Sequence, residues 1–151
     1  MMRILVLCTH NSARSQMAEA WLRHYASELD LDAKICSAGN EKTFVKPDAI
    51  RVMKEVDIDI SEHTSKTIYE LPDLWNFDVL MTVCDSANEA CPVYPAKTTR
   101  LHVSFPDPSG QGLERWREVR DAMAITCLNL VTMLKAGELP FEAQLQPKGL
   151  S

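Results

Sequence analysis

Residues 4–15 read Ile-Leu-Val-Leu-Cys-Thr-His-Asn-Ser-Ala-Arg-Ser, and this stretch sets the fold that we expect of the chain. Its apolar start is typical of a parallel strand buried on both faces, which ends at Cys8. A helical pattern of apolar residues then begins near Arg14. A short loop at a helix N-terminus favours an anion, because its N–H groups are unpaired and the helix dipole attracts negative charge. A thiol placed there loses its proton easily. Since Arg14 offers planar donors that suit a tetrahedral oxyanion, we predict an oxyanion site around a Cys8 thiolate.

Most of the predicted anion contacts come from the loop itself. Asn11 tolerates a left-handed backbone and braces a tight loop through its side chain. Ser15 is placed to donate a hydrogen bond toward the Cys8 sulfur, which would favour the thiolate. The residues expected to hold the anion are Thr9, His10, Asn11, Ser12, Ala13 and Arg14.

Length and composition indicate a single domain over residues 1–151, with 46% hydrophobic residues and a net charge of −5. The negative charge argues against a nucleic acid or an anionic membrane as partner. No apolar run approaches the roughly 18 residues of a membrane span, and residues 1–7 are too short for a signal peptide. Five scattered cysteines without an export signal indicate a reducing cytosol. We therefore expect a cytoplasmic protein, and a monomer.

Strands and helices alternate along the predicted pattern. This alternation favours a three-layer α/β/α fold around a four-stranded parallel sheet with right-handed crossovers. The expected strands are Arg3–Leu7, Ala33–Ala38, Phe77–Val83 and Thr98–Val103, and the expected helices run over residues 12–31, from Pro47 onward and over 112–135, before an irregular tail from about 138. Ligands of such folds bind beyond the carboxyl ends of the strands. Cys8, Cys84 and the loop Ser104–Asp107 should therefore meet at one sheet edge.

Cys84 and Cys91 enclose six residues of polar character, Asp-Ser-Ala-Asn-Glu-Ala. Two interpretations besides ordinary semi-buried cysteines are open. A zinc site needs about four ligands and usually shows tighter cysteine spacing, with His10 and His102 as the nearby candidates. A redox pair fits better, since a mobile polar segment of this length permits two arrangements, and we predict no metal site.

Asp107 lies between two prolines in Phe-Pro-Asp-Pro-Ser. It is either a simple turn aspartate or a general acid, because two prolines stiffen a loop so that a carboxyl faces a leaving oxygen.

Together these residues resemble a known family. Residues 8–19, Cys-Thr-His-Asn-Ser-Ala-Arg-Ser-Gln-Met-Ala-Glu, resemble the thiol loop of arsenate reductases built on the low-molecular-weight protein tyrosine phosphatase fold. The resemblance continues, from about Arg3 to Lys135, through 37–39 (Ser-Ala-Gly), 47–50, 59–66, 82–85, 90–92 (Ala-Cys-Pro) and 105–108 (Phe-Pro-Asp-Pro). Phosphatases share the Cys-x5-Arg loop, whereas the pair Cys84 and Cys91 is typical of the thioredoxin-coupled reductases.

The resemblance implies a relay of three thiols that serves arsenic detoxification. The Cys8 thiolate attacks arsenate, held by the loop amides and Arg14, while Asp107 protonates the departing oxygen. Cys84 then attacks Cys8 and expels arsenite, and Cys91 attacks Cys84. Thioredoxin reduces the resulting Cys84–Cys91 disulfide, and each attack is by a thiolate on an accessible sulfur. Phosphate or sulfate would compete with arsenate.

Two positions depart from the commonest family pattern. His10 stands where glycine is frequent, and we interpret it as an exposed loop residue, with a role in lowering the pKa of Cys8 as the alternative. Lys66 stands where some members carry an aspartate that helps to hold potassium beside Asn11, Glu19 and Ser37. We expect the Lys66 ammonium to replace that ion and meet Glu19, so that no potassium is required.

The alternative function is a low-molecular-weight phosphatase that hydrolyses phosphomonoesters through a phosphocysteine. Asp107 is followed by Pro108, Ser109 and Gly110, which offer no aromatic platform for a phenyl ring. We therefore expect only weak phosphatase side activity. Cys36 and Cys127 are interpreted as small core residues.

Overall fold

Four parallel strands form the centre of the fold in the computed structural model, which describes residues 1–85 and 89–150. The strands are β1 (Met2–Leu7), β2 (Ala33–Ala38), β3 (Val79–Thr82) and β4 (Thr99–His102), in the order β2-β1-β3-β4. Leu7 at the end of β1 pairs with Ala38 of β2 and with Thr82 of β3. The carboxyl ends of these three strands are therefore level with one another, as the sequence predicted.

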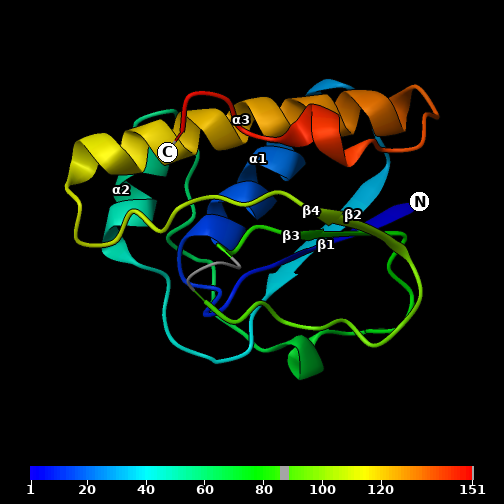
Figure 1. Ribbon diagram of the computed structural model, residues 1–151, viewed down its shortest axis with the longest axis horizontal. Coiled ribbons are helices and arrows are strands. Elements are labelled where there is room, and N and C mark those ends of the chain that lie inside the picture. Colours follow the sequence, from blue (N-terminus) through cyan, green and yellow to red (C-terminus); the bar gives the residue numbers. More distant parts are fainter. Residues whose placement is uncertain (86–88, 151) are drawn as a thin grey trace.

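Three long helices cover one face of this sheet (Figure 1): α1 (Arg14–Glu28), α2 (Pro47–Lys54) and α3 (Leu113–Lys135). Ile4, Val6 and Met81 pack into the core beneath them. Pro47 begins α2, where its fixed φ suits a first helical turn and its missing N–H costs nothing. Gly137, with φ +75°, follows the end of α3 and adopts the left-handed conformation typical of a helix C-terminus.

The opposite face of the sheet is covered by irregular chain and the short 3-10 helix η1 (Ile68–Glu70), seen below the sheet in Figure 1. Thr67 and Glu70 form a reciprocal capping box around η1. A second apolar cluster fills this side, with Leu5 and Leu80 of the sheet against Phe77 and other side chains. The predicted α/β fold with a four-stranded parallel sheet is confirmed, whereas the second outer layer expected in an α/β/α fold is built from η1 and loops instead of α-helices.

Several predicted boundaries were too wide. Helix α1 begins at Arg14, after the loop that joins it to β1, and Asp30 after it takes a left-handed φ of 53°. The tail from 138 was expected to be irregular, yet it contains a short 3-10 helix, η2 (Glu142–Leu145). The Thr126 hydroxyl donates to the Leu145 carbonyl at 2.8 Å, and the Leu145 side chain is buried. These contacts fasten the tail to α3.

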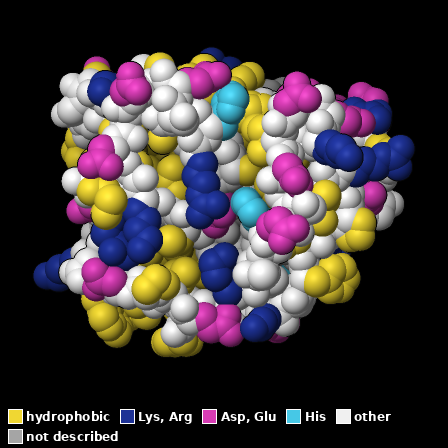
Figure 2. Space-filling view, turned by 180° about the vertical axis from the view of Figure 1, so that it is seen from behind, with side chains coloured by type: hydrophobic (Ala, Val, Ile, Leu, Met, Phe, Trp, Pro, Cys, Tyr) yellow, Lys and Arg dark blue, Asp and Glu magenta, His cyan; other side chains and the backbone are white. Residues whose placement is uncertain are grey.

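Charged side chains of both signs are mixed over the molecular face seen in Figure 2, where no broad basic surface is present. Among the helices of residues 1–85 and 89–150, none is long and apolar enough to cross a membrane. Residues 86–88, which belong to the polar segment predicted to be mobile, and Ser151 of the tail lie outside the described residues.

Candidate active site

The loop from Cys8 to Arg14 joins β1 to α1 at the carboxyl edge of the sheet. The Cys8 N–H still donates to the Ala38 carbonyl of β2, at 3.2 Å, before the chain leaves the sheet. Asn11 then takes a φ of 50°. This left-handed turn, which asparagine tolerates better than most residues, confirms the conformation predicted for Asn11.

The Asn11 side chain braces the loop from inside. Its Nδ2 donates to the hydroxyls of Ser15 (2.8 Å) and Ser37 (2.9 Å), and its Oδ1 accepts from the Lys66 N–H (3.1 Å). Gln16 adds hydrogen bonds from its amide to the Asn11 carbonyl and Oδ1. The predicted bracing is confirmed, whereas the hydrogen bond from Ser15 to the Cys8 sulfur stays a prediction.

The other loop residues predicted to hold the anion lie along the same short turn. The Thr9 hydroxyl donates to the Ala90 carbonyl at 3.0 Å, and the Ser12 carbonyl accepts from the Lys46 N–H at 2.8 Å. Ala13 is the N-cap residue of α1. The His10 imidazole is half exposed and lies 3.4 Å from the Glu41 carboxylate, which fits its interpretation as an exposed loop residue.

Gly39, directly after β2, lies against the backbone of this loop. A Cβ atom there would stand 2.7 Å from the Thr9 carbonyl oxygen and 2.8 Å from the Cys8 carbonyl oxygen and the Asn11 nitrogen. These are backbone atoms of the anion loop, which cannot rotate away as a side chain would. Only glycine therefore fits between β2 and the loop.

Gly39→Ala is expected to displace the loop, lowering both the free energy of unfolding, by about 1–3 kcal/mol, and the affinity of the reduced protein for phosphate. Urea unfolding and calorimetric titration with phosphate measure the two effects. Gly137→Ala is the matched control, because its Cβ would meet nothing within 4 Å. That variant should lose about 1–2 kcal/mol through its left-handed backbone alone and keep its phosphate affinity. Unchanged phosphate binding in Gly39→Ala would contradict the assignment.

Arg14 enters the site from the first turn of α1, with its side chain 5% exposed. Its Nη1 donates to the Phe105 carbonyl at 2.9 Å, and this bond ties it to the loop that carries Asp107. Its Nη2 lies 2.7 Å and 2.9 Å from the two carboxylate oxygens of Glu89. Within the described part of the chain, its buried Nε has no hydrogen-bond partner. The guanidinium is thus held at the loop with part of its donor set unused.

Cys8 is buried at the base of this site and carries a free thiol. Burial raises its pKa to about 11, and the negative charge of Glu89 acts in the same direction, against the lowering effect of Arg14. The expectation that the Cys8 thiol loses its proton easily is therefore wrong for this form of the protein, in which Cys84 and Cys91 are joined by a disulfide. The main physical reason is burial, which takes the charged thiolate out of water, and the nearby Glu89 carboxylate adds to this effect by repelling it.

Asp107 occupies the exposed loop after β4, where its Oδ1 accepts the Ser109 N–H at 3.0 Å. Partial burial acts to raise its pKa, but the hydrogen bond from Ser109 and the charge of Arg14 outweigh it, so the pKa lies below its usual value. The side chain is thus a turn aspartate that is ionised at neutral pH. A role as general acid requires it to gain a proton when an anion is bound, and that role stays a proposal.

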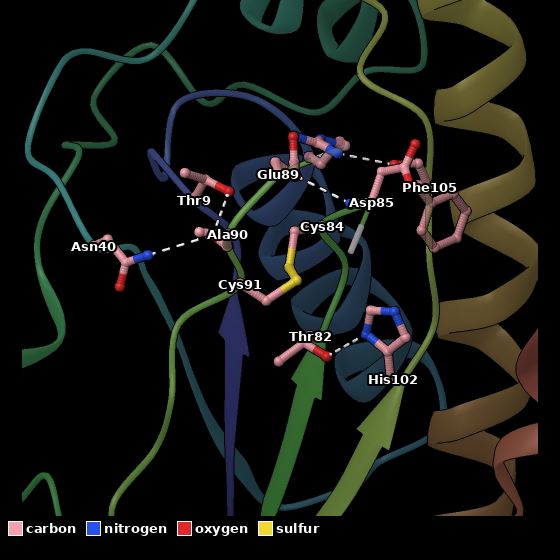
Figure 3. The surroundings of a disulfide bond; sticks show 11 residues. Thr9, Asn40, Thr82, Cys84, Asp85, Glu89, Ala90, Cys91, His102 and Phe105 are labelled. Carbon is pink, nitrogen blue, oxygen red and sulfur yellow. Dashed lines mark hydrogen bonds and ion pairs between the residues drawn. A yellow bond between two sulfur atoms is a disulfide. The ribbon is translucent and has the colours of Figure 1, made fainter. Parts of the chain in front are cut away.

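Cys84 and Cys91 are joined by a disulfide, with their Cα atoms 5.9 Å apart (Figure 3). The Val83 N–H donates to the Leu7 carbonyl at 2.9 Å, which continues the pairing of β1 with β3 past its last residue. Cys8 follows directly on the end of β1, and Cys84 lies two residues after the end of β3. Cys84 is fully buried, whereas Cys91 is partly exposed. This bond supports the redox interpretation of the pair over the zinc alternative.

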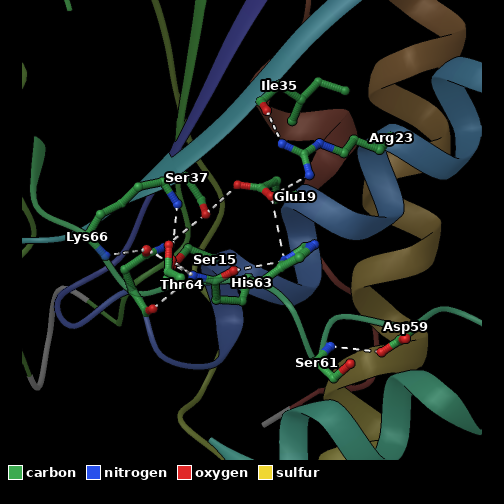
Figure 4. A network of polar contacts seen from close by, with 12 residues as sticks. Ser15, Glu19, Arg23, Ile35, Ser37, Asp59, Ser61, His63, Thr64 and Lys66 are labelled. Carbon is green, nitrogen blue, oxygen red and sulfur yellow. Dashed lines mark hydrogen bonds and ion pairs between the residues drawn. The ribbon is translucent and has the colours of Figure 1, made fainter. Parts of the chain in front are cut away.

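Beneath the loop, a polar network surrounds the Glu19 carboxylate (Figure 4), which accepts from the Ser37 hydroxyl at 2.7 Å. Arg23 Nη1 lies 2.9 Å and His63 Nδ1 3.6 Å from its other oxygen. Lys66, expected here, instead donates from its ammonium to the Thr64 carbonyl at 3.2 Å. The prediction that Lys66 meets Glu19 is wrong, because Arg23, one helical turn further along α1, already supplies the cation.

The family model described as low molecular weight phosphotyrosine protein phosphatase matches residues 3–139. The chain belongs to this family. The predicted resemblance, from about Arg3 to Lys135, agrees closely with that match.

Among curated relatives in this family, arsenate reductase 1 of Bacillus cereus (strain ATCC 10987 / NRS 248) is 45% identical over 118 residues, which are 78% of this chain and 85% of the relative. A solved structure described as an arsenate reductase in the phosphate binding state superposes with a TM-score of 0.74 at 31% identity, over 87% of this chain and 98% of the other. Another, described as an arsenate reductase in oxidized state, has a TM-score of 0.73 at 31% identity, over 89% and 99%.

The sequence interpretation missed two features of the site. Glu89 was regarded only as part of the polar segment between the cysteines, and its contact with Arg14 spans 75 residues. Phe44, exposed on the loop before α2, lines a cavity of about 340 Å³ with Ser109 and Gly110. The aromatic residue at position 44 was the sequence feature that could have indicated a contact with substrate. Nothing in the neighbouring sequence indicated that Phe44 would lie near the Asp107 loop.

Proposed function

We infer that this protein is an arsenate reductase that reduces arsenate to arsenite through Cys8, Cys84 and Cys91. The observation that carries the conclusion is the Cys84–Cys91 disulfide. Cys84 lies two residues after β3, and β3 pairs with β1, the strand that leads directly to Cys8. Hydrolysis of a phosphoester needs no second thiol. Reduction of arsenate needs two electrons, and a dithiol supplies them.

The proposed steps balance atoms and electrons. The Cys8 thiolate attacks arsenate, forming a sulfur–arsenic bond and releasing an arsenate oxygen as water, with Arg14 binding the negative oxygens and Asp107 as the proton donor. The Cys84 thiolate then attacks the Cys8 sulfur, and the electron pair of the sulfur–arsenic bond leaves with arsenic as arsenite. Cys91 attacks Cys84 in turn, which frees Cys8 as a thiolate and forms the Cys84–Cys91 disulfide.

We propose that an external dithiol, thioredoxin, reduces this disulfide by attacking Cys91. Exchange requires access to the attacked sulfur. Cys84 is fully buried, whereas Cys91 is partly exposed and lines a groove of about 430 Å³ together with Pro92 and Val93. Val93 is 82% exposed, so the groove offers apolar surface to a partner. We also propose a cytoplasmic location, because thiol relays of this kind need a reducing compartment, and a monomer, because a single chain supplies every proposed residue.

Arsenate-dependent consumption of NADPH in the presence of thioredoxin and thioredoxin reductase tests the conclusion. Steady consumption, together with mass-spectrometric detection of the Cys84–Cys91 disulfide after one arsenate turnover, is the expected result. The reduced protein can be assayed in parallel with para-nitrophenyl phosphate. Hydrolysis that exceeds arsenate reduction would favour the phosphatase alternative. The observation that supports this alternative is the exposed aromatic ring of Phe44 near Ser109.

We also propose that the enzyme needs no potassium. Arg23 neutralises Glu19 at 2.9 Å, and burial keeps the pKa of the neighbouring His63 below its usual value. A monovalent cation placed beside Glu19 would be repelled by the positive charge of Arg23, which already occupies this position. Exchange of sodium for potassium at constant ionic strength should leave kcat/KM for arsenate unchanged. A clear rise in potassium buffer would contradict this proposal.

A further inference from the structure

Glu89 binds the arginine of the anion site in the disulfide-bonded form of the protein. Both of its carboxylate oxygens lie within 2.9 Å of Arg14 Nη2, and Oε1 also accepts the Asp85 N–H at 3.0 Å. The two side chains are only 5% (Arg14) and 19% (Glu89) exposed, so water screens their attraction poorly. Figure 3 shows Glu89 on the same segment as the disulfide, beside Asp85.

A carboxylate is a close chemical substitute for part of an oxyanion. It presents two negative oxygens to a guanidinium, as phosphate or arsenate does. An oxyanion that reaches Arg14 Nη2 therefore has to displace Glu89 first. Because the Glu89 carboxylate is part of the same chain as Arg14, its effective concentration at Arg14 does not depend on the protein concentration.

The disulfide and hydrogen bonds of the neighbouring backbone hold Glu89 in this position. Cys91 lies two residues after Glu89 and is bonded to Cys84 at the end of β3. The Ala90 carbonyl accepts from Thr9 Oγ1 at 3.0 Å and from Asn40 Nδ2 at 3.4 Å, and the Glu89 N–H donates to the Asp85 carbonyl at 2.9 Å. Reduction breaks the covalent bond that holds Cys91, two residues after Glu89, to Cys84. The position of Glu89 then depends on hydrogen bonds alone, which weakens the competition.

Resting on the function inferred above, we propose that Glu89 blocks the oxyanion site as long as the Cys84–Cys91 disulfide is present, and that reduction of the disulfide releases Arg14 for substrate. The reaction sequence gives this a chemical purpose. If arsenate bonded to Cys8 while Cys84 was still oxidised, no thiolate would be at hand to expel arsenite. The arsenylated Cys8 could then only be hydrolysed back to arsenate. The charge of Glu89 also adds to the larger effect of burial in raising the pKa of Cys8.

Calorimetric titration with inorganic phosphate tests the proposal on the full chain in both redox forms, with mass spectrometry confirming that the oxidised sample holds Cys84–Cys91. The reduced protein should bind phosphate about tenfold more tightly than the oxidised protein, an ordinary size for coupling between linked sites. In Glu89→Gln the two forms should bind phosphate with nearly equal affinity, because the oxidised form has lost its competitor.

Glu41→Gln is the matched control, since it removes the same charge beside the loop at His10 without touching Arg14. It should keep the tenfold difference. Equal affinities of the two wild-type forms, a difference that persists in Glu89→Gln, or its loss in Glu41→Gln would each overturn the proposal.

A second variant keeps the test decisive if oxidised Glu89→Gln does not fold. The double variant Cys84→Ser, Cys91→Ser never forms the closed segment, and without any reductant it should bind phosphate as the reduced wild type does. Weak binding by this variant would overturn the proposal. Neither arsenate nor thioredoxin enters these measurements, so a negative result leaves the proposed function standing, and absence of arsenate turnover leaves the phosphate result intact.

Discussion

Cys8→Ser is expected to lower arsenate turnover by more than about 10⁴-fold, the scale on which loss of a catalytic nucleophile acts. A serine hydroxyl does not form a nucleophilic anion as readily as a thiol does, and it cannot form a disulfide. The loop amides and Arg14 remain, so the reduced variant should still bind phosphate. NADPH consumption measures the first effect and calorimetry the second.

Cys36→Ser is the matched control for that variant. Cys36 is a partly buried thiol on β2, packed against the cluster on the η1 side of the sheet. Its replacement should leave arsenate turnover within about twofold of wild type, as for a substitution away from the reacting atoms. Continued multiple turnover in Cys8→Ser would remove Cys8 from the proposed reaction.

Cys91→Ser is expected to stop the enzyme after a single turnover. Cys8 and Cys84 suffice to supply two electrons, so one arsenite should be released and a Cys8–Cys84 disulfide should accumulate. Without Cys91, no internal thiolate regenerates Cys8, and the fully buried Cys84 sulfur is poorly placed for thioredoxin. Rapid-quench measurement of arsenite and mass-spectrometric mapping of the disulfide record the two products.

Cys84→Ser separates this prediction from a general loss of activity. It removes the thiolate that expels arsenite, so it should release no arsenite even in the first turnover, although Cys91 is intact. Steady multiple turnover in Cys91→Ser would show that regeneration does not pass through Cys91, and the three-thiol sequence would have to be abandoned.

Local sequence was sufficient for the elements of the fold. The apolar run ending at Cys8 was predicted closely, because a buried parallel strand leaves a continuous apolar signal. The strand Ala33–Ala38 was also predicted with its bounds, although Lys34 and Ser37 interrupt its apolar residues, because Gly39 marks its end. The helix expected from Gly112 to Lys135 differs from α3 by one residue. The bounds of α1 were less accurate, because the loop that contains the left-handed Asn11 runs on to Ala13, and the left-handed Asp30 follows the C-terminus of the helix without a change in the apolar pattern.

The candidate site was predicted where neighbours in sequence are neighbours in space. Cys8, Asn11 and Arg14 lie within one loop, so their joint role was visible in the sequence. Lys66 was assigned the wrong partner, because the choice between Lys66 and Arg23 as the cation beside Glu19 depends on side-chain reach within the folded protein. The raised pKa of Cys8 likewise follows from burial and from Glu89, neither of which the loop motif specifies.

The sequence by itself thus determined the parallel α/β sheet, the loop from Cys8 to Arg14 at its edge and the positions of the three thiols, because period, spacing and residue chemistry are properties of short segments. Only the tertiary structure decided how these parts act on one another. It brought Glu89 to Arg14 across 75 residues, buried Cys84 while leaving Cys91 partly exposed, and required glycine at position 39. The physical reason is that ion pairing, burial and close packing depend on distances in space, which the separation of residues along the chain does not fix.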